Sequence, residues 1–304
     1  MLRYIIKRFF QTLLTLFLVV TFVFILLRFI GDPSKLMVSP QATAEDLAHM
    51  RAVLGLDQPL WVQYIDYLKS IVTGDLGMSY YYVRPVTDLI AETLPATLIL
   101  SGVAFLFAVP IALISGAIAA VKRNSILDNT VTTLTIAGKS MPAFWVGLLM
   151  MLLLSVKFRL LPPSGYGLKE LIMPAITLGM GLSAGTARMT RSAMLDTLRQ
   201  DYMTTARAKG NLERRTIIVH GLRNALLSVV TMLALQLGGL ISGSVLVESI
   251  FGWPGIGRLM VSAINQFDYP LVQACALMMA TVYAVVNFIT DLLYTVIDPR
   301  ISYR

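Results

Sequence analysis

The 304-residue sequence contains little cysteine, histidine or charge. Its one cysteine, Cys275, excludes a disulfide within the chain. The two histidines, His49 and His220, lie in different loops, so we expect neither a shared metal site nor a histidine-based catalytic pair. Charged residues make up only 14%, against about 25% in a typical soluble domain. This composition excludes an ordinary soluble protein.

The sequence is instead rich in long apolar runs. Six runs match or approach the roughly 17–25 residues that cross a bilayer. A backbone in lipid must satisfy its own hydrogen bonds, so these runs are expected to be helices. The predicted spans cover about 9–30, 95–121, 129–156, 171–188, 224–247 and 269–297. The sequence therefore predicts an all-α integral membrane protein with six transmembrane helices.

Basic residues predict the orientation of these spans. The net charge is +8, and the segments on the N-terminal side of the membrane hold 15 of the 25 lysines and arginines. Positive loops favour the cytoplasm, so the N- and C-termini are both predicted to be cytoplasmic. The chain is expected to lie in a lipid bilayer, and its cytoplasmic loops explain the positive net charge. No nucleic-acid partner is expected.

Two segments on the other side are long. Residues 31–94 contain helical patterns at 47–54 and 61–68, separated by Asp57-Gln58-Pro59, and are predicted to form an external cap. In the second, at 248–268, three glycines and a proline within 251–257 exclude a regular helix. The predicted division is a first unit at 1–30, the cap at 31–94, and a core permease unit at 95–304.

The predicted cytoplasmic loop at 191–222 includes the most informative stretch, 201–215. Small residues at 204–206 and 208 favour a short helix that docks closely in a groove. Gly210 is placed to end this helix in a left-handed cap. Charged residues, Arg214 among them, suit a turn that faces a partner. A short helix held in another protein's cleft transmits a rigid displacement to the attached spans.

The motifs TARAKG at 205–210 and HGLRNAL at 220–226 resemble the coupling loop of permeases of binding-protein-dependent ABC importers. The family consensus has glutamate and alanine where this chain has Thr205 and Arg207, a variant typical of the dipeptide, oligopeptide and nickel branch. GDPS at 31, LGLDQPL at 54, ESIFGWPGIGRL at 248 and DLLYTVIDPRI at 291 extend the resemblance along the chain. The coupling residues it implies are Thr205, Ala206, Arg207, Ala208, Lys209, Gly210 and Arg214.

The resemblance also implies partners and a location. It implies the ABC importer permease fold in a bacterial cytoplasmic (inner) membrane, a second homologous permease, two ATPase subunits and an extracytoplasmic substrate-binding protein. ATP and Mg²⁺ would be used by the ATPase subunits, with no cofactor or metal bound by this chain. Short peptides are the expected substrate, with nickel or a metal chelate as the alternative.

Four residues are candidates for the translocation path. Lys139 lies within an apolar run, where a charge usually faces a cavity or a partner, and Met141-Pro142 is expected to kink the helix beside it. Lys139 alternatively snorkels or pairs with a carboxylate. Glu248 either contacts a substrate or the binding protein or is an exposed loop charge. Asp291 is expected to pair with a basic residue near the cytoplasmic face.

The sequence fits two other classes of protein less well. Gly138-Lys139-Ser140 resembles the end of a phosphate-binding loop, but Thr133 stands where that motif needs glycine, so no ATPase site is expected in this chain. A secondary transporter would be expected to show internal repeats and several buried ionisable groups. No convincing repeat is present, and a coupling loop has no purpose without an ATPase.

Overall fold

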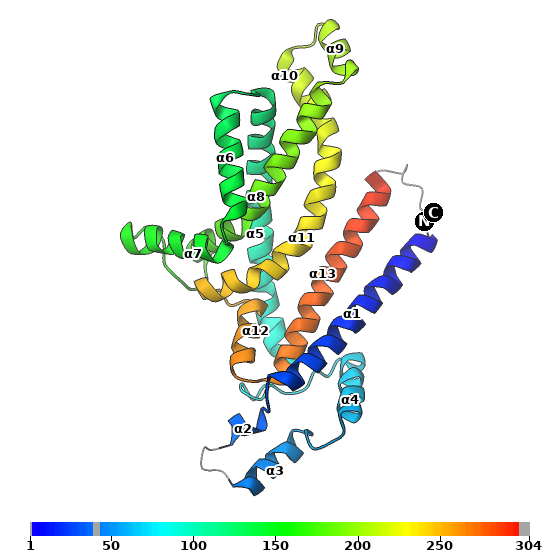
Figure 1. Cartoon of the computed structure of the whole chain (residues 1–304), viewed down its shortest axis with the longest axis vertical. Coiled ribbons are helices and arrows are strands. Elements are labelled where there is room, and N and C mark those ends of the chain that lie inside the picture. Colours follow the sequence, from blue (N-terminus) through cyan, green and yellow to red (C-terminus); the bar gives the residue numbers. More distant parts are fainter. Residues whose placement is uncertain (1, 39–42, 298–304) are drawn as a thin grey trace.

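The computed structural model describes residues 2–38 and 43–297, and within them the chain is helical apart from turns and an isolated bridge between Met78 and Pro85. Long helices form the bundle in Figure 1: α1 (Leu2–Ile30), α5 (Val86–Val121), α8 (Leu168–Leu198), α11 (Arg223–Phe251) and α13 (Tyr269–Ile297). Shorter α-helices are α2 (Ser34–Met37), α3 (Ala44–Val53), α4 (Leu60–Thr73), α6 (Ile126–Ser140), α7 (Ala143–Met150), α9 (Asp201–Ala208), α10 (Glu213–Arg215) and α12 (Ile256–Asn265). Two π-helical segments, η1 (Met151–Lys157) and η2 (Thr216–Leu222), continue α7 and precede α11.

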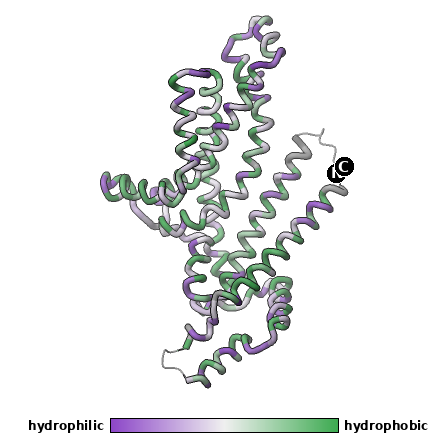
Figure 2. Tube along the Cα trace, in the orientation of Figure 1, coloured by the Kyte–Doolittle hydropathy of each residue, from purple (hydrophilic) through white to green (hydrophobic). Residues whose placement is uncertain are grey.

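The bundle has two polar ends. Helices α9 and α10 project at one end, while α2, α3, α4 and α12 gather at the opposite end (Figure 1). Figure 2 shows hydrophilic residues concentrated at these ends and mainly hydrophobic residues along the long helices between them. This distribution is expected for helices that cross an apolar layer.

Helices α5 and α8 pack at the centre of the bundle because small residues let their backbones approach closely. A Cβ atom added at Gly116 of α5 would lie 2.7 Å from Thr190 Cβ of α8 and would overlap the Ala187 carbonyl oxygen. At Gly179 of α8 an added Cβ would lie 2.9 Å from the Ala104 carbonyl oxygen of α5. Small residues at helix contacts are typical of membrane bundles.

Helices α1 and α13 pack against each other beside this core. Near one end of the pair, Arg8 Nη1 lies 3.0 Å from Asp291 Oδ2. The prediction that Asp291 pairs with a basic residue is therefore confirmed. At the other end, the Tyr269 hydroxyl donates to the Gly31 carbonyl oxygen.

The predicted kink at Met141-Pro142 is a sharp break. Helices α6 and α7 meet there at 105°, and Met141 is extended (φ −80°, ψ 129°). A residue before proline is driven from the helical region by its clash with the proline ring, which explains the position of the break. The predicted kinked span over 129–156 is thus two helices with different directions.

The predicted count of spans is only partly matched. Among the described residues, four helices are long and apolar enough to cross a membrane, namely α1, α5, α11 and α13, or five if the bent segment from α6 to η1 forms one span. The predicted span at 171–188 lies in α8, which is longer than expected and is not among these candidates. Helix α5 begins already at Val86, so the segment predicted as a cap over 31–94 shares its last residues with this helix.

The cap segment contains both predicted helices. Thr43 caps α3 through a hydrogen bond accepted from the Asp46 amide, and Asp46 in return accepts from the Thr43 amide. Pro59 directly precedes α4, as its fixed φ favours. Gly74 ends α4 in the left-handed conformation, with φ +76°.

Candidate functional site

Helix α9 is the predicted docking helix, and it projects beyond the bundle (Figure 1). It ends at Ala208, and Gly210 follows with φ +77°, donating its amide to the Arg207 carbonyl oxygen at 2.9 Å. No atom lies within 4 Å of a Cβ added at Gly210, so its backbone conformation, and not lack of space, requires glycine. The predicted short helix and its left-handed glycine cap are confirmed.

One face of α9 is buried against η2, the segment that precedes α11. Met203 is fully buried and Ala206 is 7% exposed. A Cβ added at Gly221 in η2 would lie 3.6 Å from the methyl carbons of both Met203 and Met194. Met203 of α9 and Met194 of α8 thus meet at Gly221, and η2 contacts α8, α9 and α11. Ala206, one of the predicted coupling residues, therefore faces the chain itself.

The other face of α9 and the turn after it point away from the bundle. The predicted coupling residues that are exposed here are Thr205, Arg207, Ala208, Lys209, Gly210 and Arg214. Two apolar side chains accompany them: Tyr202 is 41% exposed and Leu212 is 79% exposed. Exposed aromatic and aliphatic groups beside basic residues are a composition typical of a protein contact surface. Sequence reasoning did not single out Tyr202 or Leu212.

An ion pair joins α9 to α10. Arg207 Nη2 lies 3.0 Å from Glu213 Oε1, and Arg207 Nε donates to Glu213 Oε2 at 3.1 Å. This hydrogen bonding lowers the pKa of Glu213 and raises the pKa of Arg207, so both groups stay charged at neutral pH. The pair holds α10 beside α9, and Asn211 Nδ2 adds a hydrogen bond to the Ala206 carbonyl oxygen at 3.0 Å.

A second ion pair at the same end connects α6 with α8. Arg191 Nε and Nη2 donate to Asp128 Oδ1 and Oδ2 at 2.6 and 2.8 Å, and the Asp128 side chain is only 3% exposed. Asp128 also accepts from the Asn124 amide at 2.9 Å. The spacing Ser125-x-x-Asp128 signals a helix start, but nothing in the sequence links Asp128 to a partner so far along the chain. Sequence reasoning missed this pair.

Lys139, Met141 and Pro142 lie at the break between α6 and α7, and all three are exposed. Beside them, helices α5, α6 and α8 line an open cavity of about 360 Å³. Its lining includes Ile111, Leu134, Gly138, Met141, Met180 and Ala184 and is mostly apolar. Met141 is thus the predicted path residue that lines a cavity.

Glu248 is fully buried, so the expectation of an exposed loop charge is wrong. Its carboxylate accepts hydrogen bonds from Thr97 Oγ1 at 2.7 Å and from the Arg258 amide at 3.1 Å. A Cβ added at Gly255 would overlap this carboxylate, which explains the glycine in the turn. Glu248 therefore lies beneath the turn between α11 and α12 and connects it to α5.

The irregular turn predicted within 251–257 is present between α11 and α12. Gly252 adopts φ +64°, and Trp253 Nε1 donates to the Ala96 carbonyl oxygen at 2.8 Å. The Ile256 amide donates to Thr97 Oγ1 at 2.9 Å. The turn is anchored to α5 by these bonds, and α12 follows from Ile256, a helix that sequence reasoning did not predict.

A bundle of long, largely apolar helices with a short, ion-paired helix projecting from one end is the architecture of a membrane protein that crosses the bilayer several times. The family described as "Binding-protein-dependent transport system inner membrane component" matches residues 108–303, and its N-terminal counterpart matches residues 1–101. The chain belongs to this family. The predicted ABC importer permease is confirmed, and the chain is a multi-pass inner-membrane subunit and not the ATPase.

Related proteins cover the whole chain. The glutathione transport system permease protein GsiC of Escherichia coli (strain K12) is 42% identical over 306 residues, covering 100% of both chains. The protein of the same name from Shigella flexneri serotype 5b (strain 8401) has the same identity and coverage. This family membership removes the secondary-transporter alternative.

Solved structures support the fold. A chain of the inward-facing MetNI methionine ABC transporter superposes with a TM-score of 0.57 at 20% identity, covering 70% of this chain and 97% of that one. A chain of an amino acid ABC transporter with histidines gives a TM-score of 0.54 at 17% identity, covering 71% and 95%. At these identities the likeness shows the ABC importer permease fold alone.

Proposed function

We propose that this chain is one of two permeases of an ATP-driven importer that moves short peptides into the cell. The observation that carries the proposal is the 42% identity, over the whole chain, to a permease named for glutathione transport. Glutathione is a tripeptide, so the likeness favours peptides over nickel or a metal chelate. Groups of three or more potential metal ligands are also absent from the residues that the structure describes.

The proposed topology has six spans. Helix α8 runs alongside α5 within the bundle and supplies one further span, although its polar residues keep it out of the candidates chosen by hydropathy. The bent segment from α6 to η1 supplies another. The α9 end is cytoplasmic because Arg207, Lys209, Arg214 and Arg215 gather there. Both termini lie on the cytoplasmic side, and the end that carries α2, α3, α4 and α12 faces outward.

The exposed face of α9 and the turn after it form the docking surface for one of two ATPase subunits, which use ATP and Mg²⁺. Thr205, Arg207, Ala208, Lys209 and Arg214 contact that subunit, whereas Ala206 and Gly210 keep the helix in shape. Support comes from the two faces of α9, because Met203 ties its inner side to α8 and η2. A second permease and an extracytoplasmic binding protein complete the importer.

The translocation path passes the break between α6 and α7. Lys139, Met141 and Pro142 are exposed there beside an apolar cavity, and a lysine at this position suits the carboxylate of a peptide. Glu248 does not contact the substrate, because its carboxylate already accepts hydrogen bonds from Thr97 and the Arg258 amide. It supports the path by fixing the turn at 252–257.

The test is reconstitution of the importer as it co-purifies with a tagged chain. Proteoliposomes with ATP inside and the binding protein outside are supplied with labelled glutathione, another tripeptide or Ni²⁺. ATP-dependent uptake of a peptide supports the proposal. Uptake of Ni²⁺ alone, or peptide uptake that needs no ATP, contradicts it.

A further inference from the structure

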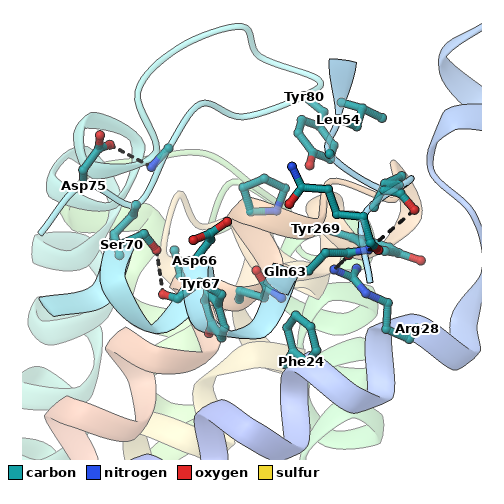
Figure 3. A pocket seen from close by; sticks show the side chains of 18 of the residues that line it. Phe24, Arg28, Leu54, Gln63, Asp66, Tyr67, Ser70, Asp75, Tyr80 and Tyr269 are labelled. Atoms are coloured by element: carbon teal, nitrogen blue, oxygen red, sulfur yellow. Dashed lines mark hydrogen bonds between the residues drawn. The ribbon is translucent and has the colours of Figure 1, made fainter. Parts of the chain in front are cut away.

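A cavity of about 410 Å³ lies at the end of the bundle opposite α9, where α1, α4 and α13 meet. Figure 3 shows Phe24 and Arg28 of α1 below the hollow, with Gln63 and Tyr67 of α4 beside them. The cavity is separate from the docking surface on α9 and from the break between α6 and α7. Its position at the last turn of the apolar run Ile5–Phe29 places it at the level where α1 leaves the membrane.

Arg28 supplies a positive charge to this cavity. None of the ion pairs between described residues includes Arg28, although its Nη2 donates to Gln63 Oε1. Its Nε is buried without a hydrogen-bond partner among the described residues. The guanidinium carbon lies 4.7 Å from the centre of the Phe24 ring and 5.5 Å from that of Tyr269, so aromatic rings flank it. A partly buried guanidinium with a free donor is suited to an oxyanion.

Two tyrosines add donors on the same cavity. The Tyr67 hydroxyl is buried and has no hydrogen-bond partner among the described residues. Burial raises the pKa of Tyr80 to about 12, against a smaller lowering by Arg28, so this hydroxyl stays protonated. Buried polar groups are normally satisfied, and an unpartnered donor needs an explanation. Tyr67 and the Nε of Arg28 are both explained by an acceptor seated in the cavity.

Two carboxylates, those of Asp66 and Asp75, also line the cavity, but neither pairs with Arg28 in the part of the chain that the structure describes. Asp66 lies 3.1 Å from Lys69 Nζ, and its side chain is 56% exposed. Asp75 accepts from the Gly77 amide at 3.1 Å. The positive charge of Arg28 therefore remains available for an anion.

The remaining lining combines polar residues, such as Gln58, Ser70 and Gln273, with apolar ones, and the neighbouring surface is apolar. Ala274 and Leu277 of α13, with Phe24 of α1, line the cavity between the two helices. Outside it, the large side chains Ile25, Phe29 and Trp61 are 47%, 84% and 67% exposed. Aromatic side chains such as Trp61 are typical of the membrane interface. A polar cavity beside an exposed apolar surface matches a molecule with a charged head and hydrocarbon chains.

We propose that this cavity binds the phosphate headgroup of a phospholipid in the membrane leaflet opposite α9. The phosphodiester accepts hydrogen bonds from Arg28 Nε and the Tyr67 hydroxyl, and the acyl chains lie along the exposed side of α1. The lipid then connects α4 of the cap segment to α1 and α13.

The test measures lipid retention by the intact importer. The complex is purified in detergent with added phosphatidylglycerol, and bound lipid is counted by native mass spectrometry. Wild type and the control Lys35→Gln, which removes an exposed cation of α2 outside the lining, are expected to retain one phosphatidylglycerol per chain at this cavity. Arg28→Gln is expected to weaken retention about tenfold, and Tyr67→Phe about threefold.

Competition experiments identify which part of the phospholipid the cavity recognises. Diacylglycerol, which has the chains without the phosphate, and inorganic phosphate, which has no chains, are each expected to leave phosphatidylglycerol bound at equal concentration. Equal retention in Arg28→Gln and wild type overturns the proposal. Displacement by diacylglycerol shows that the phosphate is not recognised, and displacement by inorganic phosphate shows a free-anion site; either overturns it. If Arg28→Gln does not assemble, Tyr67→Phe decides the question, since it keeps the ring.

Discussion

Arg191 of α8 holds Asp128 of α6 through both carboxylate oxygens, at 2.6 and 2.8 Å. The pair lies at the same end of the bundle as α9 and fixes the start of α6 against α8. A displacement that enters through α9 therefore meets helices that are already connected to one another.

Replacing Asp128 by asparagine tests this connection. Because the Asp128 side chain is only 3% exposed, Asp128→Asn leaves Arg191 without its charged partner and is expected to cost about 1.5–3 kcal/mol. Thermal unfolding of the purified chain in detergent measures the loss. The double variant Asp128→Asn/Arg191→Gln is expected to lose less than the sum of the single variants. Additive losses contradict a direct pair.

The close approach of α5 and α8 gives a second prediction. Gly116→Ala places a Cβ against the Ala187 carbonyl oxygen and is expected to destabilise the chain by about 1–3 kcal/mol. Gly102→Ala on the same helix is the matched control, because no atom lies within 4 Å of its added Cβ. Melting temperatures that do not separate the two variants show that the helices are not packed as described.

Glu248 gives a third prediction. Glu248→Ala removes the acceptor for Thr97 and for the Arg258 amide, at about 1–3 kcal/mol for each buried group left without a partner. Thermal unfolding is again the measurement. Glu92→Ala serves as the control, since Glu92 is exposed and its ion pair with Arg84 is screened by solvent. Equal melting temperatures for Glu248→Ala and wild type contradict the buried role.

The pair between Arg207 and Glu213 gives a fourth prediction. The pKa of Glu213 is lowered by its hydrogen bonds to Arg207, so the pair is complete above the ordinary carboxylate range and is lost as the pH falls through the lowered value. At neutral pH, Glu213→Gln is expected to leave the melting temperature unchanged, because both groups are exposed, but to reduce uptake per ATP hydrolysed. Glu45→Gln, on an exposed residue of α3, is the control. Uptake equal to wild type shows that the pair has no part in coupling.

Local signals in the sequence predicted several features correctly. Gly210 was assigned its left-handed cap because only glycine adopts that conformation without strain. The break at Met141-Pro142 followed from the restriction that proline places on the preceding residue. These signals depend on a few adjacent residues, so the local structure can be predicted from them without knowledge of the fold.

Features that depend on distant residues were not predicted. Glu248 was expected to be exposed or to contact a substrate or the binding protein, but its burial results from Thr97 of α5, far away in the sequence. The Asp128–Arg191 pair, the burial of Ala206 and the cavity at Arg28 also arise from packing between separate helices. The helix that carries the predicted fourth span also continues beyond residue 188, as a more polar stretch that ends at Leu198.

The exposed face of α9 is the proposed docking surface for an ATPase subunit, and Ala208→Trp changes this surface. Ala208 is exposed, so a large side chain there blocks a docking groove without disturbing the packing of Met203. The chain is tagged, purified gently from its host membranes, and its co-purifying subunits are counted. We expect the ATPase subunits to be lost with Ala208→Trp and retained with Ala44→Trp, on the exposed start of α3. Full retention of the ATPase subunits and undiminished uptake with Ala208→Trp would contradict it.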